Sequence, residues 1–284
     1  MINRLLLITI FSLSFGYLFG LKPEIKKKPS NKGRLYAFWG WNRGYYSKSD
    51  IHFRGDNYNF TLKDVVAKDS PTSFALNPYF HPSWITIPQT NLRIGYFIND
   101  KLDISIGDDH MKYIMVQEQT VGITGRINDG SIYEGNYTGE DIKLAEDLLT
   151  FEHTDGLNYI NVELTRNDDI LEALNIIHNF NRIQLNSLVG IGAGVLYPKS
   201  NVRLLYGKRH DAFHFAGYGF GAKAGLNLTL FKYLFFRSEL KYGFINMPDI
   251  RTSPSTSDKA SQHFFFSQVN FSFGFTLYPF KKSE

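Results

Sequence analysis

The sequence of 284 residues contains no cysteine. This absence excludes a disulfide framework, a thiolate zinc site and a cysteine nucleophile. A bacterial lipoprotein anchor also requires a cysteine, so that form of membrane attachment is excluded as well. The formal net charge is only +4, and part of it comes from a basic N-terminal stretch, so no nucleic-acid partner is expected.

The sequence also lacks the composition of a helical membrane protein. Hydrophobic residues make up 43% of the chain and the mean hydropathy is −0.23. Aromatic residues are abundant at 16%, with 25 Phe and 17 Tyr. β-Strands and the aromatic girdles of membrane-embedded barrels favour these residue types.

The N-terminal region has the features of an export signal. Arg4 precedes an apolar stretch at residues 5–19, which is short for a membrane span, so we expect a signal peptide over residues 1–20. A short membrane anchor is the alternative. Residues 21–33 (LKPEIKKKPSNKG) predict a flexible basic tail. The remaining residues, 34–280, are expected to form one domain.

A sustained alternation dominates residues 212–244. Tyr218, Phe220 and their even-numbered neighbours are apolar, whereas Gly217, Gly219 and Lys223 occupy the other face. Period 2 over such a length predicts two long strands joined by a tight turn at residues 231–233. A polar inner face and an apolar outer face are typical of a transmembrane β-barrel.

The same pattern predicts an all-β fold, an antiparallel transmembrane β-barrel of about eight strands with long external loops and short helical segments. Short connections at residues 99–100, 166–181 and 231–233 alternate with long ones, which places both termini on the periplasmic side. Helical turns are expected at 140–151 and at 168–179, the latter capped by Asp168. The expected strands cover residues 34–46, 89–98, 101–116, 158–165, 182–197, 216–230, 234–244 and 262–280. In strand 101–116 a β-bulge at 107–109 is expected to turn Met111, Tyr113 and Met115 outward.

The signal sequence, the eight amphipathic strands and the aromatic-rich last strand resemble the small outer-membrane β-barrels of Gram-negative bacteria. An aromatic residue usually ends such chains, whereas Phe280 here is followed by four further residues. The segments GWNRGYYSKSDIHF, FEHTDGLNY and SDKASQHFFF look like those of exported barrels without an assigned activity. The resemblance implies location in the cell outer membrane, contact with its lipid and a monomer. A barrel of this size is filled by side chains, so a general porin is not expected.

Histidines and acids at the external strand ends are the candidate ligand site. One pair, in His210-Asp211-x-x-His214, lies on one face of a helix or a strand. With Asp155 nearby, a divalent metal is one interpretation, but a third fixed ligand is missing and a polar rim is favoured, so no metal and no cofactor are assigned. The candidate residues are His110, His153, Asp155, His210, Asp211, His214 and His263.

Two further features of the inward face bear on function. Inward glycines at 190, 192, 194, 217, 219 and 221 leave either an open cavity or space for bulky neighbours. Lower in the barrel, charged residues of both signs predict an interior polar plug, because unpaired buried ions are costly; a proton or ion path is the alternative. The plug residues are Arg93, Glu163, Arg182, Lys223, Arg237, Glu239 and Lys241.

The sequence therefore predicts an outer-membrane barrel with a ligand- or surface-interaction site at the external rim, its partner a small lipid or a surface ligand. The alternative is a hydrolase or acyltransferase that modifies outer-leaflet lipid with rim His, Asp and Ser side chains. Serines are available, as in His81-Pro82-Ser83, but no lipase-type motif is present. A secreted soluble barrel is disfavoured because the outward rows are uninterrupted and apolar.

Overall fold

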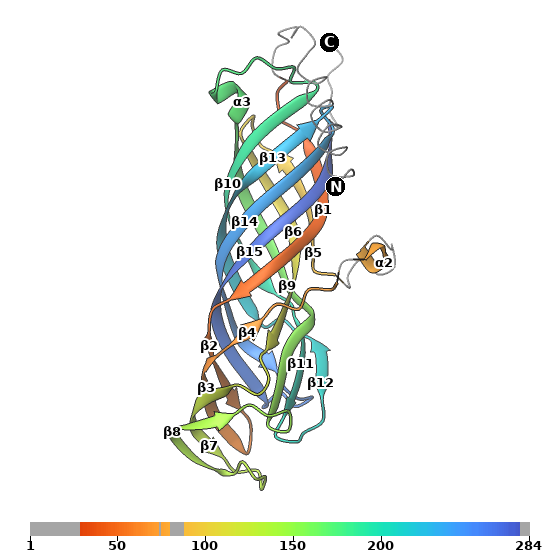
Figure 1. Cartoon of the computed structure of the whole chain (residues 1–284). Coiled ribbons are helices and arrows are strands. Elements are labelled where there is room, and N and C mark those ends of the chain that lie inside the picture. Colours follow the sequence, from red (N-terminus) through yellow and green to blue (C-terminus); the bar gives the residue numbers. More distant parts are fainter. Residues whose placement is uncertain (1–28, 74, 80–87, 279–284) are drawn as a thin grey trace, which may run out of the picture.

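A closed β-barrel forms the centre of the molecule (Figure 1). The computed structural model describes residues 29–73, 75–79 and 88–278. Eight antiparallel strands pair in the order β1-β5-β6-β9-β10-β13-β14-β15, and β15 pairs again with β1 to close the ring. The predicted fold class is therefore confirmed. The ring strands are β1 (Leu35–Tyr46), β5 (Thr90–Phe97), β6 (Leu102–Met115), β9 (Leu149–Asp169), β10 (Ile183–Leu196), β13 (Gly217–Leu230), β14 (Leu234–Arg251) and β15 (Lys259–Leu277).

The outward side chains of the ring form an apolar belt. On β6 the outward residues Ile104 and Ile106 are 43% and 57% exposed, and on β14 Leu240 is 65% exposed. The inward residues between them are buried and polar, such as Ser105 and Glu239. This arrangement inverts that of a soluble barrel and matches a barrel surrounded by lipid. Among the residues that the structure describes, no helix is long and apolar enough to cross a membrane.

The two ends of the barrel differ in construction. Short turns, helix α3 (Ile170–Ala173) and both ends of the described chain gather at one end (Figure 1). By the loop-length rule this end is periplasmic. Residues 1–28, which contain the expected signal peptide and most of the expected tail, lie outside the described residues. The last residues of that tail contact the barrel, because Ser30 Oγ and the Asn31 amide both donate to the carboxylate of Asp100.

The opposite end extends into a β-rich external lobe, which we define as the strands beyond the belt. Strand β9 runs for 21 residues and β15 for 19, well beyond the length that the belt requires. The upper part of β15 pairs with β2, and the sheet continues as β2-β3-β7-β8, while β11 pairs with β9 and β12, and β4 pairs with β6. The lobe strands are β2 (Ser49–Arg54), β3 (Tyr58–Val65), β4 (Ala67–Lys68), β7 (Thr120–Ile127), β8 (Gly135–Lys143), β11 (Lys199–Leu204) and β12 (His210–Phe213).

An apolar core fills the lobe. Phe53, Phe60 and Phe151 are almost completely buried between its strands. Met111, Tyr113 and Met115 of β6 also belong to this core, with at most 1% of each exposed. The prediction that these three residues face outward after a bulge at 107–109 was therefore wrong. These three residues lie on the same inward face of β6 as Asp109, and the interior of the molecule changes there from polar to apolar. The shift in the register between β6 and β9 lies between Met111 and Tyr113.

The helical predictions were correct in one place and wrong in the other. Residues 140–151 form no helix: β8 ends at Lys143, a turn follows, and β9 begins at Leu149. Pairing with β7 and β11 takes up this backbone, and Leu148 is buried in the lobe core. Helix α3 lies inside the predicted 168–179 segment, with Asp169 as the N-cap in place of Asp168. A second short helix, α2 (Leu76–Tyr79), lies beside the barrel (Figure 1).

Candidate functional site

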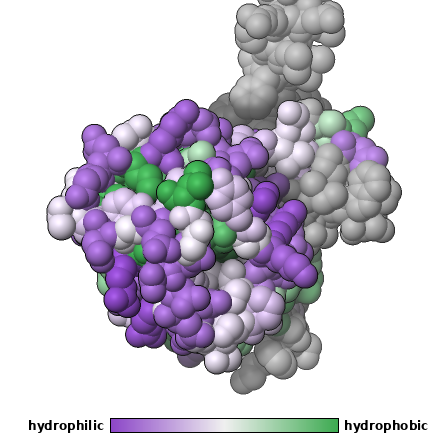
Figure 2. All heavy atoms as spheres, turned by 90° about the horizontal axis from the view of Figure 1, so that it is seen from below, coloured by the Kyte–Doolittle hydropathy of each residue, from purple (hydrophilic) through white to green (hydrophobic). Residues whose placement is uncertain are grey.

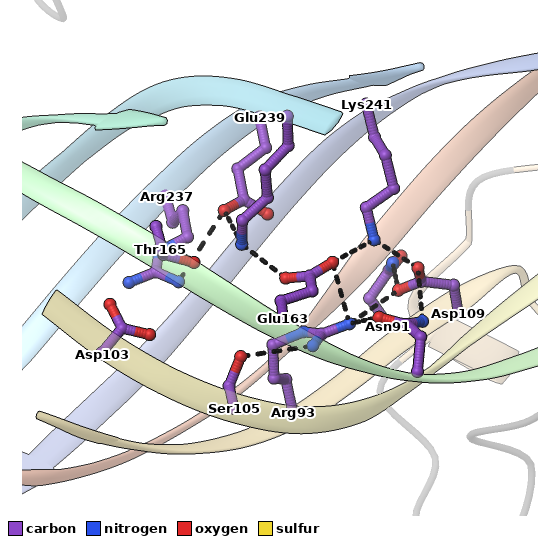
Figure 3. A network of polar contacts seen from close by, with 12 residues as sticks. Asn91, Arg93, Asp103, Ser105, Asp109, Glu163, Thr165, Arg237, Glu239 and Lys241 are labelled. Carbon is purple, nitrogen blue, oxygen red and sulfur yellow. Dashed lines mark hydrogen bonds and ion pairs between the residues drawn. The ribbon is translucent and has the colours of Figure 1, made fainter. Parts of the chain in front are cut away.

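A network of charged side chains crosses the barrel interior at the level of the belt (Figure 3). Glu163 of β9 lies at its centre, 2.6 Å from Lys223 Nζ, 2.6 Å from Lys241 Nζ and 3.2 Å from Arg93 Nη2. Lys223 also contacts Glu239 at 2.8 Å. Each of these five side chains is at most 5% exposed. The predicted plug residues of these strands are therefore brought together.

Two aspartates complete the network. Asp109 forms an ion pair with Lys241 and lies 3.7 Å from Arg93, and it accepts from Asn91 Nδ2 at 2.6 Å. Asp103 accepts from Tyr36 at 2.6 Å, and its charge acts on Arg237. The four cations Arg93, Lys223, Arg237 and Lys241 thus face four carboxylates, those of Asp103, Asp109, Glu163 and Glu239. Such balance is what a buried set of charges requires.

Aromatic rings close the interior on the periplasmic side of this network. The Arg237 guanidinium lies 5.0 Å from the ring centroid of Phe38 and 5.2 Å from those of Tyr36 and Phe235. With Phe97 these rings form a buried cluster. Cation–π contacts stabilise a guanidinium in such surroundings. Arg182, the seventh predicted plug residue, precedes β10 in a turn and is not a member of the network.

Neighbouring groups occupy the space beside the inward glycines. A Cβ on Gly192 would lie 2.7 Å from Glu163 Cγ, and one on Gly219 would lie 3.1 Å from a ring carbon of Tyr159. The cavity between Tyr159, Gly192, Gly221 and the charged network measures about 10 Å³, and another near Arg237 measures about 20 Å³. A single water needs about 10–15 Å³. Of the two interpretations of the glycines, close packing matches the structure.

The predicted rim residues do not form one site. His153 is completely buried in the lobe core, where its ring lies 5.1 Å from Phe151 and 5.6 Å from Tyr113. Neither of its nitrogens has a hydrogen-bond partner among the described residues. Burial of this imidazole lowers the pKa of His153 to about 3, so the ring is neutral. His263, in contrast, is exposed on the outer face of β15, where its ring lies beside that of Phe244.

Four of the predicted rim residues lie around the hairpin of β11 and β12. Lys199 Nζ lies 2.8 Å from Asp155 and 3.4 Å from Asp211, and the bond to Lys199 lowers the pKa of Asp155. His210 opens β12 and is half-buried. His214 follows the hairpin, and its Nε2 lies 3.0 Å from Asp249, which also pairs with Lys259 at 3.0 Å. The acids are thus held by lysines, and among the described residues no group of three His, Asp or Glu is arranged to hold a metal ion.

His110 occupies a different position, on the outer face of β6 just above the belt. Its Nδ1 lies 2.7 Å from Asn158 Oδ1 of the neighbouring β9. Its Nε2 has no partner in the described part of the chain, and the side chain is only 7% exposed. Thr90 is its paired residue on the opposite neighbour, β5. In this pattern of hydrogen bonds Nδ1 donates and Nε2 is left as an acceptor.

The arrangement bears on the lipid-enzyme alternative. No serine hydroxyl lies within hydrogen-bond distance of a histidine nitrogen in residues 29–73, 75–79 and 88–278. His81, Pro82 and Ser83 lie outside the described residues. Asp109 was not among the predicted plug residues, although it belongs to the charged network. Its inward parity, shared with Ser105, was the signal that could have found it.

No protein-family model matches the sequence, and no curated protein matches it. Among solved structures, the chain is similar to OprG from Pseudomonas aeruginosa, with 10% identity, a TM-score of 0.40, and coverage of 89% of this chain and 99% of OprG. AlkL in DMPC bilayers gives 11% identity, a TM-score of 0.40 and coverage of 93% and 99%. For Ail of Yersinia pestis, in complex with the heparin analogue sucrose octasulfate, the identity is 10% and the TM-score is 0.32. The match covers 87% of this chain and 99% of Ail.

OprG and AlkL are outer-membrane proteins, and the chain resembles small barrels of that kind in fold. The closed ring of strands shows the fold of this chain, and the apolar belt around the ring is that of an outer-membrane barrel. The chain is an outer-membrane β-barrel.

Proposed function

We propose that this protein is a non-conducting outer-membrane barrel that acts through the outer surface of its external lobe. The observation that carries the proposal is the filled interior. Aromatic rings, the charged network and the lobe core follow one another along the barrel axis. In the part of the chain that the structure describes, the two cavities beside the network hold about one water each, so we expect no path for a solute across the barrel.

The surface of the lobe offers two hairpins for contact with a partner. Figure 2 looks at this end of the molecule and shows a mainly hydrophilic surface. Residues 117–147, which include β7 and β8, contain seven acidic and two basic residues. The hairpin of β11 and β12 carries the rim candidates His210 and Asp211, with Asp155 beside it. A surface ligand with positive charge fits the first hairpin best.

Planar-bilayer recording tests the proposal most directly. The purified protein is expected to give no steps of ion conductance above those of a protein-free bilayer. Steady open-channel conductance in the unmodified protein would overturn the proposal. Binding of an oligolysine peptide should weaken in the Glu140→Gln, Asp141→Asn variant and with added salt, whereas the Asp168→Asn variant, altered at the opposite end, should bind as the parent does.

One observation favours a second candidate, a reaction on outer-leaflet lipid. His110 belongs to the outward row of β6 at the membrane border, and its Nδ1 bond to Asn158 leaves its buried Nε2 as an acceptor without a partner among the described residues. A histidine oriented in this way can take a proton from a hydroxyl. Mass spectrometry of lipid A from cells with the parent gene, without it, and with His110→Ala tests this candidate. Identical lipid in all three would exclude it.

A further inference from the structure

The outer face of the barrel wall carries a group of polar and charged side chains where β5 begins. β5 begins at Thr90, which pairs with Trp41 of β1 on one side and with His110 of β6 on the other. Above this point β4 pairs with β6 at Ile114 and Met115 in place of β5. We call the place where β5 gives way to β4 the β5 notch, and define it by Thr90, Arg43, Lys112, His110 and Tyr79.

Two cations flank the β5 notch. Arg43 lies two residues beyond Trp41, and Lys112 two residues beyond His110, so both belong to the outward rows of their strands. The charge of Arg43 acts unfavourably on that of Lys112, while Asp69 and Asp155 act on Lys112 more strongly and in the opposite sense. Like charges placed side by side are unfavourable unless an anion lies between or beside them.

The contacts of both cations are with neutral atoms. Arg43 donates to Tyr79 Oη at 3.3 Å and to the Asn42 carbonyl at 2.9 Å. Lys112 Nζ donates to Thr72 Oγ1 at 3.4 Å. Tyr79 in turn donates to the Thr72 carbonyl at 2.7 Å, which links the two cations into one arrangement. Neither cation forms a salt bridge with a described residue, and the sequence of residues 80–87 contains no acid.

Asp69 is the carboxylate that acts most strongly on Lys112, and its hydrogen bonds are made elsewhere. It accepts from the amides of Gly44 and Ser70 at 3.0 and 2.8 Å and from Gln89 Nε2 at 2.5 Å. Asp155, which also acts on Lys112, is paired with Lys199. The local balance at the β5 notch therefore remains positive, with two cations against Asp69.

The height of the β5 notch identifies the kind of anion. From Leu102 to Lys112 strand β6 rises by about 25 Å at a tilt of about 40°, which equals the height of the apolar band of such barrels. The outward row of β6 is apolar up to Ile106 and polar from Asp108. Lys112 and Arg43 therefore lie at the level of the outer-leaflet headgroups, above lipid-facing Leu92 and Ile106.

We propose that the β5 notch binds the phosphate of an outer-leaflet lipid, with Arg43 and Lys112 on the phosphate oxygens and the apolar rows below them against the acyl chains. Arginine and lysine are the side chains that recognise phosphate in proteins. The lipid chemistry is a phosphate-bearing headgroup on a hydrophobic anchor. This site is independent of the lobe surface, and lipid binding here requires neither a protein partner nor a reaction.

Native mass spectrometry of the intact protein released from mixed micelles tests the proposal. The micelles contain either phosphatidylglycerol or monogalactosyl diacylglycerol with the same acyl chains. The unmodified protein is expected to retain one molecule of the phosphate-bearing lipid and to lose the galactolipid. Equal retention of the two lipids would overturn the proposal without any variant.

Variants locate the site. Arg43→Gln with Lys112→Gln should weaken retention of the phospholipid by about tenfold or more, because two charged donors are removed. The matched control is Arg203→Gln with Lys208→Gln, two exposed cations of the lobe, which should retain lipid as the parent does. Equal loss in both variants would show that any external charge suffices and would refute the assignment to the β5 notch.

Two further arms keep the result interpretable. Inorganic phosphate added at the concentration of the lipid should leave retention unchanged; complete displacement would mean a site for free phosphate and would overturn the lipid part of the proposal. Resistance of the folded band to mobility shift on gels establishes that the double variant is folded. If it is not, Arg43→Lys replaces it, and a retention equal to that of the parent then contradicts a role for the guanidinium.

Discussion

Removing the charge of Glu163 is expected to destabilise the barrel more than any exposed charge change. In Glu163→Gln the four interior cations face three carboxylates, and Lys223, Lys241 and Arg93 lose the anion at 2.6, 2.6 and 3.2 Å. Leaving a buried charge without its partner costs about 3–5 kcal/mol. For a domain of this size, about 1 kcal/mol corresponds to a shift in Tm of about 2–4 °C. The expected loss is therefore about 6–20 °C.

The assay is unfolding in detergent micelles, followed by tryptophan fluorescence and by the gel mobility of the folded barrel. Asp168→Asn is the control, since its partners Lys101 and Arg166 are 62% and 60% exposed, and such surface pairs contribute about 0–1 kcal/mol. A free energy of unfolding of Glu163→Gln within about 1 kcal/mol of the parent would refute the reasoning. Adding Lys241→Met to Glu163→Gln should recover part of the loss, because the two residues are coupled.

Three other expectations follow from particular side chains. Burial lowers the pKa of His153 from 6.5 to about 3, so the imidazole takes up its proton at a higher pH in the unfolded chain than in the folded protein. The free energy of unfolding should therefore drop by about 2–3 kcal/mol between pH 6.5 and 4.5. His153→Phe should remove this pH dependence, as measured by urea titrations. Gly95→Ala places a Cβ 2.1 Å from the Tyr36 ring and should cost about 1–3 kcal/mol. Gly122→Ala meets only the side chain of Lys63, whose Cβ is 3.7 Å away, and should leave Tm unchanged. Protease added to intact cells should cut within residues 130–139, and cleavage only after disruption of the outer membrane would reverse the assigned orientation.

Alternation within strands made the barrel predictable from the sequence. Each strand of the ring has one face in lipid, so residues such as Ile104 and Leu240 had to be apolar and their neighbours polar. The same rule led to the error at Met111, because it assumes a polar interior along the whole strand. Above the belt, the outward face of a strand meets water and its inward face meets the apolar lobe core. The alternation of apolar and polar residues is therefore inverted there, although the strand keeps the same faces turned inward and outward.

The site was less predictable because it depends on contacts between distant segments. Parity placed Glu163 and Lys241 on the inner face, but it could not show that Asp109 pairs with Lys241 across 132 residues of sequence. Arg182 has the same parity but lies before the first residue of β10, so it does not reach the network. The rim histidines lie at the same end of the barrel but on different faces of their strands. His153 points into the lobe core, and His263 points outward.

The filled interior also restricts the order in which the barrel can be assembled. Once β1 and β15 have paired along their register from Leu35 to Tyr46, no segment can pass through the ring. The lobe, which includes strands β2 and β3, must therefore reach the far side of the membrane while the wall is still open. Lys259–Gln262 at the start of β15 pair with β2, above the part of the same edge on which Phe266–Leu277 pair with β1. The pairing of β1 with β15 is thus the step that fixes the lobe and the barrel relative to one another.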